Sequence, residues 1–445
     1  MKVLTIVNDL GPGGTQRVAV DVTLCYQRHG HQCAVLTYNG SGPRLQELDD
    51  AGIQTFIAKH KRNSNPNTTW NTAARDWNPD IIHFHRSGKP TPDENALIRF
   101  LKDPPHQQAP ASNPDQTKPI RVIEHSHFGR CDRTKDRHLI DAHIQISKWC
   151  LWRWRTWAKG LKPQPVGAYI PHMVNADKFT VQSNEQAAQL RENHSIPQDA
   201  FLYGFIAQPN YAKWSPNLFN SFKAVAQSDS NTYLMIAGIS DKSKELYARF
   251  PDEIKSRIIV LPFIKDQQDI STAYTAMDAF VHATRIGETF GFILTESMCC
   301  NTPVLTMETP ERDNAQAEIV GHKRGGLVAA NQKELVRAML KIKEDKELYA
   351  HCKAHGREHV INEFNQERIS NMLIRFLDHV YSSTNREDLR TKLAADPLLI
   401  TSISKFELDE ASLGRMGSHT LKQRILQTVV LTPTFQRVWR VLCGS

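Results

Sequence analysis

Short apolar runs alternate with amphipathic segments along most of the chain. Residues 2–7 form the first run, a glycine-rich turn follows, and Val18, Val22 and Cys25 then recur on one face of a predicted helix. We expect Thr15 to cap that helix and residues 33–38 to form the next strand. Because a strand, a helix and a second strand follow in this order, the pattern predicts a parallel β/α arrangement.

The same alternation begins again after residue 200. Apolar runs near residues 201–207, 233–237, 258–263, 279–283 and 303–306 predict strands, and the periodic segments between them predict helices. Two successive halves of this kind predict an α/β protein. We expect two Rossmann-like, doubly wound parallel-sheet domains that face each other across a cleft.

Length and composition fit that architecture, since 445 residues are too many for one ordinary core and natural for two domains. No apolar run is long enough to span a bilayer, and the N-terminal run is too short for a signal peptide. We therefore expect a cytoplasmic protein. The net charge of +8 favours anionic partners, which include nucleotide sugars, anionic lipid surfaces and nucleic acid. Eight cysteines show no metal-type spacing, and no D-x-D carboxylate pair occurs, so we predict no metal site.

The stretch at residues 287–303, GETFGFILTESMCCNTP, carries the most chemistry. It places Glu288 in a loop after a predicted strand and Glu296 early on the following helix. Ligands of open α/β sheets bind at this edge of the sheet, and the backbone N–H groups near Phe290 and Gly291 suit an anion such as a diphosphate. Two carboxylates beside such a site can accept hydrogen bonds from sugar hydroxyls. The alternative is that both are solvated acids at a helix start.

This Glu-x7-Glu pattern, with Phe-Gly inside it, resembles the signature of the family 4 (group 1) glycosyltransferases, which are retaining enzymes of GT-B fold. The resemblance implies that Glu288 holds hydroxyls of the donor sugar and Glu296 holds the ribose. Phe290 and Gly291 would supply backbone contacts. It also implies a nucleoside-diphosphate sugar as substrate, no cofactor and no metal.

Two further segments resemble the donor-binding loops of this family. Gly13 and Gly14 precede Thr-Gln-Arg, which is similar to the family's GG-x-E-R loop with glutamine in the glutamate position. Lys213 matches the lysine that holds the donor diphosphate, whereas Gln208 stands where the family has arginine. A neutral amide adds no charge, so Gln208 either weakens donor binding or requires another cation, such as Arg17, Arg285 or Arg312.

His125 ends a predicted strand of the first half and corresponds to the family's histidine near the donor sugar and the reacting centre. His127 and His85 end strands at the same edge and are weaker candidates, since any of the three could be structural. Glu318 resembles the glutamate of the family's G-G-x-x-E segment, although residues 314–315 are Asn-Ala in place of the two glycines.

The resemblance also implies domain boundaries, because residues 166–179 are similar to the crossover between the two halves of these enzymes. We expect an acceptor-side domain at 1–170, a donor-side domain at 171–365 and a helix at 366–383 that packs back on the first domain. A basic extension follows at 384–445. Its end is amphipathic and could lie on the inner face of an anionic membrane or on the protein itself.

The implied reaction is metal-independent transfer of a sugar, with retention, to a glycan or lipid-linked acceptor in cell-surface polysaccharide or glycolipid synthesis. The main alternative is a catalytically silent GT-B scaffold that binds a sugar nucleotide. A sugar-nucleotide epimerase is a further one. Nucleic-acid binding rests only on charge and on the tryptophan-rich helix at 147–160, and we predict none. In that helix we expect the tryptophans to pack and the arginines to be solvated.

Overall fold

The computed structural model describes residues 1–57, 69–102 and 119–432. The proline-rich, polar segment at 103–119, whose composition predicts a surface loop, lies almost wholly outside the described residues. The chain divides into two compact units. The first comprises Met1–Met173 and Glu367–Ile403, and the second Val174–Gln366 and Ser404–Ser445. The extension expected at 384–445 is therefore divided at residue 403. Among the described helices, none is long and apolar enough to cross a bilayer.

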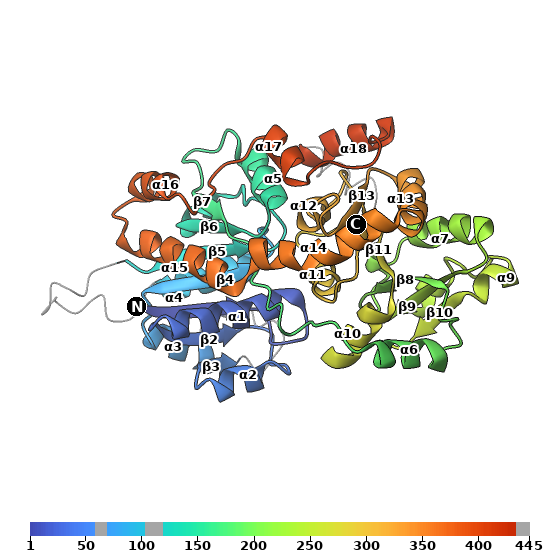
Figure 1. The fold of residues 1–445 in the computed structure, drawn as a ribbon. Coiled ribbons are helices and arrows are strands. Elements are labelled where there is room, and N and C mark those ends of the chain that lie inside the picture. Colours follow the sequence, from blue (N-terminus) through green and yellow to red (C-terminus); the bar gives the residue numbers. More distant parts are fainter. Residues whose placement is uncertain (58–68, 103–118, 433–445) are drawn as a thin grey trace, which may run out of the picture. The chain divides into compact units, whose positions relative to one another are not determined.

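The first unit contains a sheet of seven parallel strands in the order β3-β2-β1-β4-β5-β6-β7 (Figure 1). Its strands are β1 Lys2–Val7, β2 Gln32–Thr37, β3 Gln54–Ile57, β4 Ile81–Arg86, β5 Arg121–Ser126, β6 Ala142–Gln145 and β7 Gly167–Tyr169. Its helices are α1 Gly14–Arg28, α2 Leu45–Asp50, α3 Thr69–Asp76, α4 Pro92–Lys102, α5 Lys148–Ala158, α15 Gln366–Ser382 and α16 Arg386–Ala395, with a 3-10 turn, η2, at Lys135–Leu139.

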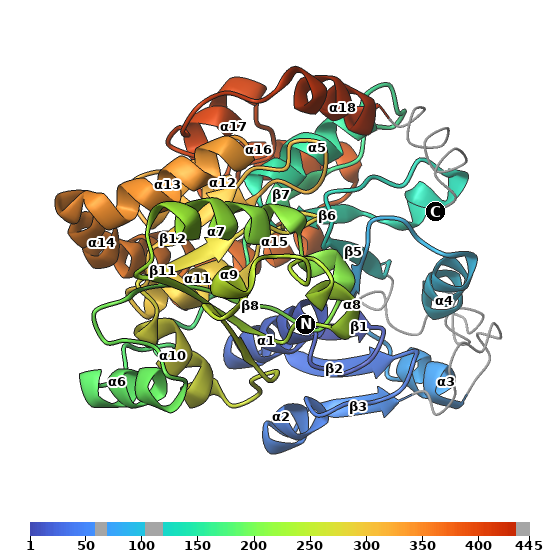
Figure 2. The ribbon, with the colours of Figure 1, turned by 90° about the vertical axis from the view of Figure 1, so that its right-hand side faces the viewer.

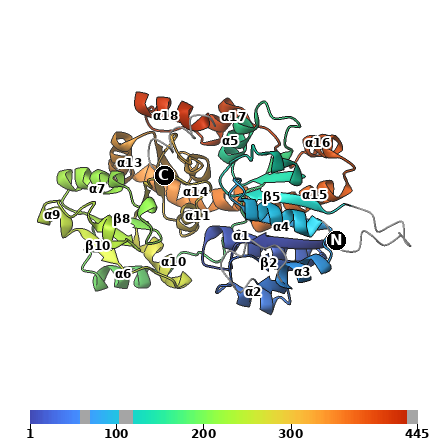
Figure 3. The ribbon, with the colours of Figure 1, turned by 180° about the vertical axis from the view of Figure 1, so that it is seen from behind.

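Successive residues of a strand point to opposite faces of the sheet, and the two faces of this sheet carry different chemistry. Leu4 and Ile6 of β1 pack in one apolar cluster with residues of α3 and α4, which are seen beside the strands in Figure 3. Val7 packs in a second cluster with residues of α1 and α2. The α1 face also holds polar groups, because the hydroxyl of Thr23 donates to Thr5 Oγ1 at 2.7 Å.

The second unit contains six parallel strands in the order β10-β9-β8-β11-β12-β13, and its helices α7 and α13 lie side by side (Figure 2). Its strands are β8 Phe201–Ile206, β9 Thr232–Ala237, β10 Ile258–Leu261, β11 Ala279–His282, β12 Val304–Met307 and β13 Gly326–Ala329. Its helices are α6 Asn184–Asn193, α7 Pro216–Ser228, α8 Asp241–Lys244, α9 Asp252–Lys255, α10 Gln267–Ala276, α11 Phe292–Cys299, α12 Gln316–Val320, α13 Gln332–Glu344, α14 Lys346–Phe364, α17 Lys405–Ala411 and α18 Leu421–Leu431, with a 3-10 turn, η3, at Tyr211–Lys213.

Strand order reverses between β1 and β4 in the first sheet and between β8 and β11 in the second. At such a reversal the loops after the two central strands leave in opposite directions and open a crevice at the carboxyl edge. The loop after β8 contains Lys213, and the loop after β11 contains Glu288. Topology thus brings together two segments that lie far apart in the sequence.

Two local predictions are wrong. Helix α1 is capped by Gly13 and begins at Gly14, so Thr15 is its second residue and not its cap. In α5 the tryptophans are packed as expected, but Arg153 is 4% exposed and its guanidinium lies over the rings of Trp149 and Trp157, 4.9 and 5.0 Å from the ring centroids. Arginine stacks well on aromatic faces, and this stacking accounts for its burial.

Candidate functional site

Lys213 and Glu288 form an ion pair where strand order reverses in the second sheet. Lys213 ends the η3 turn, which Asn210 caps by accepting a hydrogen bond from the backbone N–H of Ala212 at 3.0 Å. From there Lys213 Nζ donates to Glu288 Oε1 at 2.6 Å. The carboxylate is buried and the lysine half-buried, so little water competes for the pair.

The pair keeps Glu288 ionised. Burial alone would raise the pKa of this carboxyl, but the charge of Lys213 and the hydrogen bonds from His282 and Lys213 outweigh it and lower the pKa to about 2. His282 ends β11 and lies 3.4 Å from Glu288 Oε1, while its other ring nitrogen bonds Thr306 Oγ1 at 3.0 Å. Sequence reasoning missed His282, although its position at the end of a strand was the available signal.

The loop between β11 and α11 depends on two glycines. Gly287 has φ +69°, and a Cβ there would come within 1.7 Å of the carbonyl oxygen of Asp313. Gly291 is the N-cap of α11 with φ +90°, a conformation that other residues rarely adopt. Phe290 is buried with its ring 5.2 Å from that of Phe292. The loop therefore places the first backbone N–H groups of α11 a few residues after Glu288.

Glu296 lies on α11 in a different electrostatic environment. Burial raises the pKa of its carboxyl to about 7, and a hydrogen bond from Tyr274 opposes this rise only in part. That hydroxyl lies 3.3 Å from Glu296 Oε2. The two glutamates of the Glu-x7-Glu pattern therefore differ in charge near neutral pH, because only Glu288 has a cation beside it.

Of the cations considered as replacements for arginine at position 208, Arg285 lies in the same unit and beside the same turn. Its Nε donates to the carbonyl oxygen of Trp214 at 2.7 Å, and its guanidinium lies 4.4 Å from the ring centroid of Tyr211. Gln208 itself is exposed. Arg17 belongs to the first unit, where it pairs with Asp21 at 3.0 Å.

The segment after β12 is hydrogen-bonded to the loop that carries Glu288. Gln316 Oε1 accepts the backbone N–H of Glu288 at 3.1 Å, and the N–H of Ala315 donates to the carbonyl oxygen of Glu288 at 2.8 Å. Asn314 Oδ1 accepts the N–H of Thr309 at 2.6 Å. The Asn-Ala pair at 314–315 thus takes part in closing this loop. Glu318, the remaining predicted residue here, is buried on α12.

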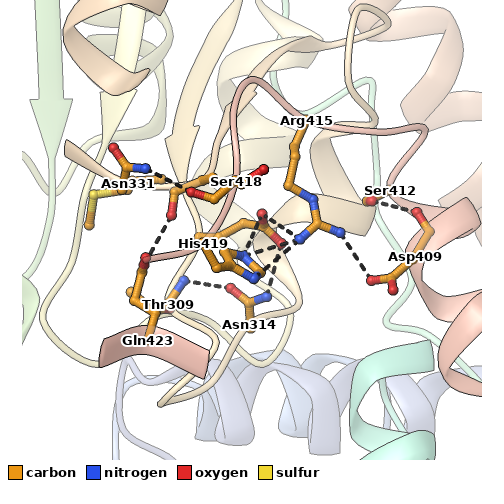
Figure 4. A network of polar contacts seen from close by, with 12 residues as sticks. Thr309, Asn314, Asn331, Asp409, Ser412, Arg415, Ser418, His419 and Gln423 are labelled. Atoms are coloured by element: carbon orange, nitrogen blue, oxygen red, sulfur yellow. Dashed lines mark hydrogen bonds and ion pairs between the residues drawn. The ribbon is translucent and has the colours of Figure 1, made fainter. Parts of the chain in front are cut away.

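Residues 409–423 of the second unit reach the same segment through Glu308, which is 3% exposed. Its Oε2 lies 3.3 Å from Arg415 Nη1 and 3.0 Å from His419 Nε2, and its Oε1 accepts from Asn314 Nδ2 at 3.3 Å. Arg415 also donates to Asp409 Oδ1 at 3.0 Å, and Figure 4 shows its side chain extending toward Asp409. Sequence reasoning placed no role on this carboxylate, because Arg415 and His419 lie more than a hundred residues further along the chain.

In the first unit, Gly13 and Gly14 lie at the start of α1. Neither has a positive φ, so no left-handed backbone conformation requires glycine at these two positions. A Cβ at Gly13 would come within 2.4 Å of Gln16 Oε1. Gln16 in turn donates through Nε2 to Asn8 Oδ1 at 3.1 Å and Asp9 Oδ1 at 2.9 Å. Here glycine leaves space for a side chain that ties the helix start to the end of β1.

The strand-end histidines lie together on the α1 face of the first sheet. His85 of β4 and His125 of β5 are register partners, and their ring centroids lie 4.6 Å apart. Two hydrogen bonds of 3.2 Å cross between the strands, one from His83 Nε2 to His125 Nδ1 and one from His85 Nδ1 to His127 Nε2. Sequence reasoning named three of these residues and missed His83, which lies two residues before His85.

Burial keeps these rings neutral. It lowers the pKa of His83 to about 3 and that of His127 to about 3, and it lowers the pKa of His85 and His125 well below the ordinary value, with neighbouring histidines adding to the effect on His83, His85 and His125. A neutral imidazole has a hydrogen on only one of its two nitrogens, so each ring has one donor nitrogen and one acceptor nitrogen.

Three of the rings could be considered as metal ligands, because His83, His85 and His125 offer nitrogens within 4.8 Å of one another. Two imidazoles on one zinc ion hold their nitrogens no more than about 4.2 Å apart, given Zn–N distances of about 2.0–2.1 Å. The two ring nitrogens that lie farthest apart would have to move closer together before both could bind one zinc ion. The hydrogen bond between His83 and His125 would also have to break. The expectation of no metal stays a prediction.

Two parallel α/β units of this topology define the GT-B fold of glycosyltransferases, and solved structures share it. HepE of Anabaena in complex with UDP and glucose is 16% identical over 85% of this chain and 99% of its own, with a TM-score of 0.65. A glycosyltransferase of Rickettsia africae is 16% identical over 86% and 99%, with a TM-score of 0.65. Sucrose-phosphate synthase of Thermosynechococcus elongatus is 15% identical over 86% and 99%, with a TM-score of 0.61.

At these identities the likeness establishes the fold. Residues 186–359 match the family described as "Glycosyl transferases group 1", a range that contains Lys213, Glu288 and Glu296. Over this range, which is part of the second unit, the chain is similar to the group 1 glycosyltransferases. No curated protein matches the sequence.

Proposed function

We propose that this protein transfers a sugar from a nucleoside-diphosphate donor, with retention at the anomeric carbon and without a metal ion, to a glycan or lipid-linked acceptor. The observation that carries the proposal is the buried pair of Lys213 and Glu288 where strand order reverses, 2.6 Å apart and next to the N-terminus of α11. A cation and oriented N–H groups stabilise a departing diphosphate, and an ionised carboxylate accepts hydrogen bonds from sugar hydroxyls.

In this proposal Lys213 binds the donor diphosphate together with the N–H groups of Phe290 and Gly291, and Glu288 holds hydroxyls of the donor sugar. Glu296 accepts from the ribose. Arg285 supplies the positive charge that Gln208 lacks, since its guanidinium is anchored within the turn that carries Lys213. HepE was solved with UDP and glucose, which makes UDP-glucose the first donor to try.

The remaining predicted residues lie outside this pair. Gly13 and Gly14 would let the backbone approach the diphosphate, and His125 would contact the donor sugar, with His127 and His85 behind it. Glu318 would support the donor loop. The acceptor belongs to cell-surface polysaccharide or glycolipid synthesis, at the cytoplasmic face of a membrane.

The test is a thermal-shift screen of the whole chain against UDP-, GDP-, ADP- and dTDP-sugars, beside Lys213→Ala and Glu296→Ala. Donor binding to the folded state raises the midpoint of thermal unfolding by mass action. A donor concentration of a hundred times Kd adds about 2.7 kcal/mol to the unfolding free energy. We expect one nucleotide to shift the midpoint, and both variants to lose the shift. Lys223→Ala, a substitution on the surface of α7, is the matched control.

The reaction is then run in EDTA with the donor that the screen selects. The anomeric configuration of the product, measured by proton NMR, tests retention, and turnover in EDTA tests metal independence. An inverted product, or loss of turnover in EDTA that a divalent ion restores, would contradict the proposal. A donor that binds and is never turned over with any glycan or lipid-linked acceptor would favour the second candidate, a silent sugar-nucleotide-binding scaffold. The neutral Gln208 is the observation in favour of that candidate.

A further inference from the structure

The side chain of Tyr26 on α1 contacts the cluster formed by His83, His85, His125 and His127, and it does so at His83. Its side chain is fully buried, and its hydroxyl lies 2.8 Å from His83 Nδ1. His83 Nε2 continues to His125 Nδ1 at 3.2 Å. The three side chains therefore form one hydrogen-bonded chain, from a helix to the end of β5.

The single hydrogen of Tyr26 sets the direction of this chain. A buried hydroxyl must donate its hydrogen or lose a hydrogen bond that water would have made, and its hydrogen-bond partner among the described residues is His83 Nδ1. His83 then accepts at Nδ1, carries its own hydrogen on Nε2 and donates to His125 Nδ1. His125 accepts at Nδ1, so its hydrogen is on Nε2.

The opposite direction is disfavoured by the same accounting. It would place hydrogens on His125 Nδ1 and His83 Nδ1, so the Tyr26 oxygen would accept from His83 and the hydroxyl hydrogen would have no acceptor among the described residues. Burial raises the pKa of Tyr26 well above its ordinary value and lowers that of both histidines, so neither ionisation relieves the conflict. The first arrangement thus satisfies Tyr26 and His83 and leaves only Nε2 of His125 without a partner among these three side chains.

The far end of the chain is unsatisfied. His125 is 2% exposed, and its Nε2 has no hydrogen-bond partner among the described residues. His125 also lines a small cavity of about 10 Å³ in the first unit, together with Asp21 and Val22 of α1, Pro171 and His172, which has room for about one oxygen atom. A buried N–H without a partner in a pocket wall is a site for an oxygen atom of a ligand.

We propose that Tyr26 and His83 are positioning residues, which hold the hydrogen of His125 on Nε2 so that His125 donates a hydrogen bond to an oxygen of the bound sugar. This rests on the proposed function, in which His125 contacts the donor sugar. With its hydrogen on Nε2, His125 is not a base at that atom. It is a neutral donor.

The test is the tautomer of His125 in the whole chain without any ligand, measured by long-range proton–nitrogen correlation on protein labelled with ¹⁵N-histidine. His125→Gln identifies the signals of His125 by their loss. In the native chain we expect a pyrrole-type Nε2 and a pyridine-type Nδ1. In Tyr26→Phe, which removes only the hydroxyl, we expect a mixture of the two tautomers. His127→Gln, in the other hydrogen-bonded pair, should leave the His125 tautomer unchanged.

Hydrogen on Nδ1 in the native chain, or the same tautomer in native and Tyr26→Phe protein, would overturn the inference. So would coordination shifts at His83 and His125 on addition of Zn²⁺, because both nitrogens would then be metal ligands. Where turnover is present, Tyr26→Phe should lower kcat/KM about tenfold, the equivalent of one hydrogen bond. A fixed tautomer in a protein that binds no donor would refute the proposed function alone.

Discussion

At the residue scale, the two glutamates of the donor loop have the same chemical group and opposite behaviour. Glu288 has Lys213 at 2.6 Å and His282 at 3.4 Å, and its pKa falls to about 2. Among the described residues, the hydrogen-bond partner of Glu296 is the neutral hydroxyl of Tyr274, and burial raises the pKa of Glu296 to about 7. Glu288 is therefore ionised at every physiological pH, whereas Glu296 changes charge near neutrality.

This difference predicts the pH dependence of donor binding. If ribose hydroxyls donate to ionised Glu296, affinity should rise about tenfold between pH 6 and pH 8, as the ionised fraction of a group with a pKa of about 7 rises. Calorimetric titration at several pH values measures it. Glu296→Gln should bind more weakly than native protein at pH 8, with no such rise. An unchanged slope in that variant would contradict the assignment.

The same raised pKa has the opposite sign for folding. The folded state holds a proton on Glu296 that the unfolded state, with an ordinary pKa of 4.5, releases. The contribution of this carboxyl to the unfolding free energy therefore falls as pH rises from 4.5 through 7. Donor affinity and the stability of the empty protein change in opposite directions with pH at this residue.

At the scale of elements, the segment between α17 and α18 is attached to the second sheet by backbone hydrogen bonds of Met416 with Val328 and Ala330 and by side-chain contacts, among which the buried carboxylate of Glu308 pairs with Arg415 and His419. Asn314 connects it to the segment that closes the Glu288 loop. A substitution in residues 404–431 that disturbs Glu308 should therefore also alter the loop that carries Glu288.

Arg415→Met should lower the unfolding free energy by about 1–3 kcal/mol, because it leaves the buried Glu308 carboxylate with fewer partners. Urea unfolding measures it, and a double-mutant cycle with Glu308→Gln should give a coupling of about 1 kcal/mol or more. Arg424→Met, which removes the same charge from an exposed position of α18, should change little. Additive effects of Arg415→Met and Glu308→Gln would show that the contact is not a stabilising pair.

At the scale of the whole molecule, the net charge of +8 and the exposed face of α18 suit an anionic surface. Leu421 and Ile425, four residues apart on α18, are 74% and 55% exposed, and Lys422 and Arg424 beside them are also exposed. Apolar side chains flanked by cations are typical of a helix that lies in a membrane interface.

We expect the protein to sediment with vesicles that contain phosphatidylglycerol, less with phosphatidylcholine vesicles, and less in 0.5 M salt, where charges are screened beyond about 4–5 Å. A variant with Leu421→Ser and Ile425→Ser should bind less. A paired Leu398→Ser and Ile400→Ser variant, at exposed apolar positions of the other unit, is the control. Equal binding of both variants to anionic vesicles would exclude α18 as the contact.

The sequence by itself determined the alternation of strands and helices, the parallel class of both sheets and the loops that carry Lys213, Glu288 and the histidines. These features follow from periodicity and from strand-end position, which are local properties of the chain. The strands predicted in the second half agree with β8, β9, β10, β11 and β12 to within two residues at each end. Helix α6 and the short strand β13 were not predicted.

Only the tertiary structure decided which of these groups meet. The partners of the Lys213–Glu288 pair are 75 residues apart, and those of the Tyr26–His83 bond are 57 apart. Pairing at such separations depends on strand order and register, which no local pattern contains. Burial decided the rest, because the same carboxyl group has a low pKa at Glu288 and a raised one at Glu296 according to which neighbours the fold places beside it.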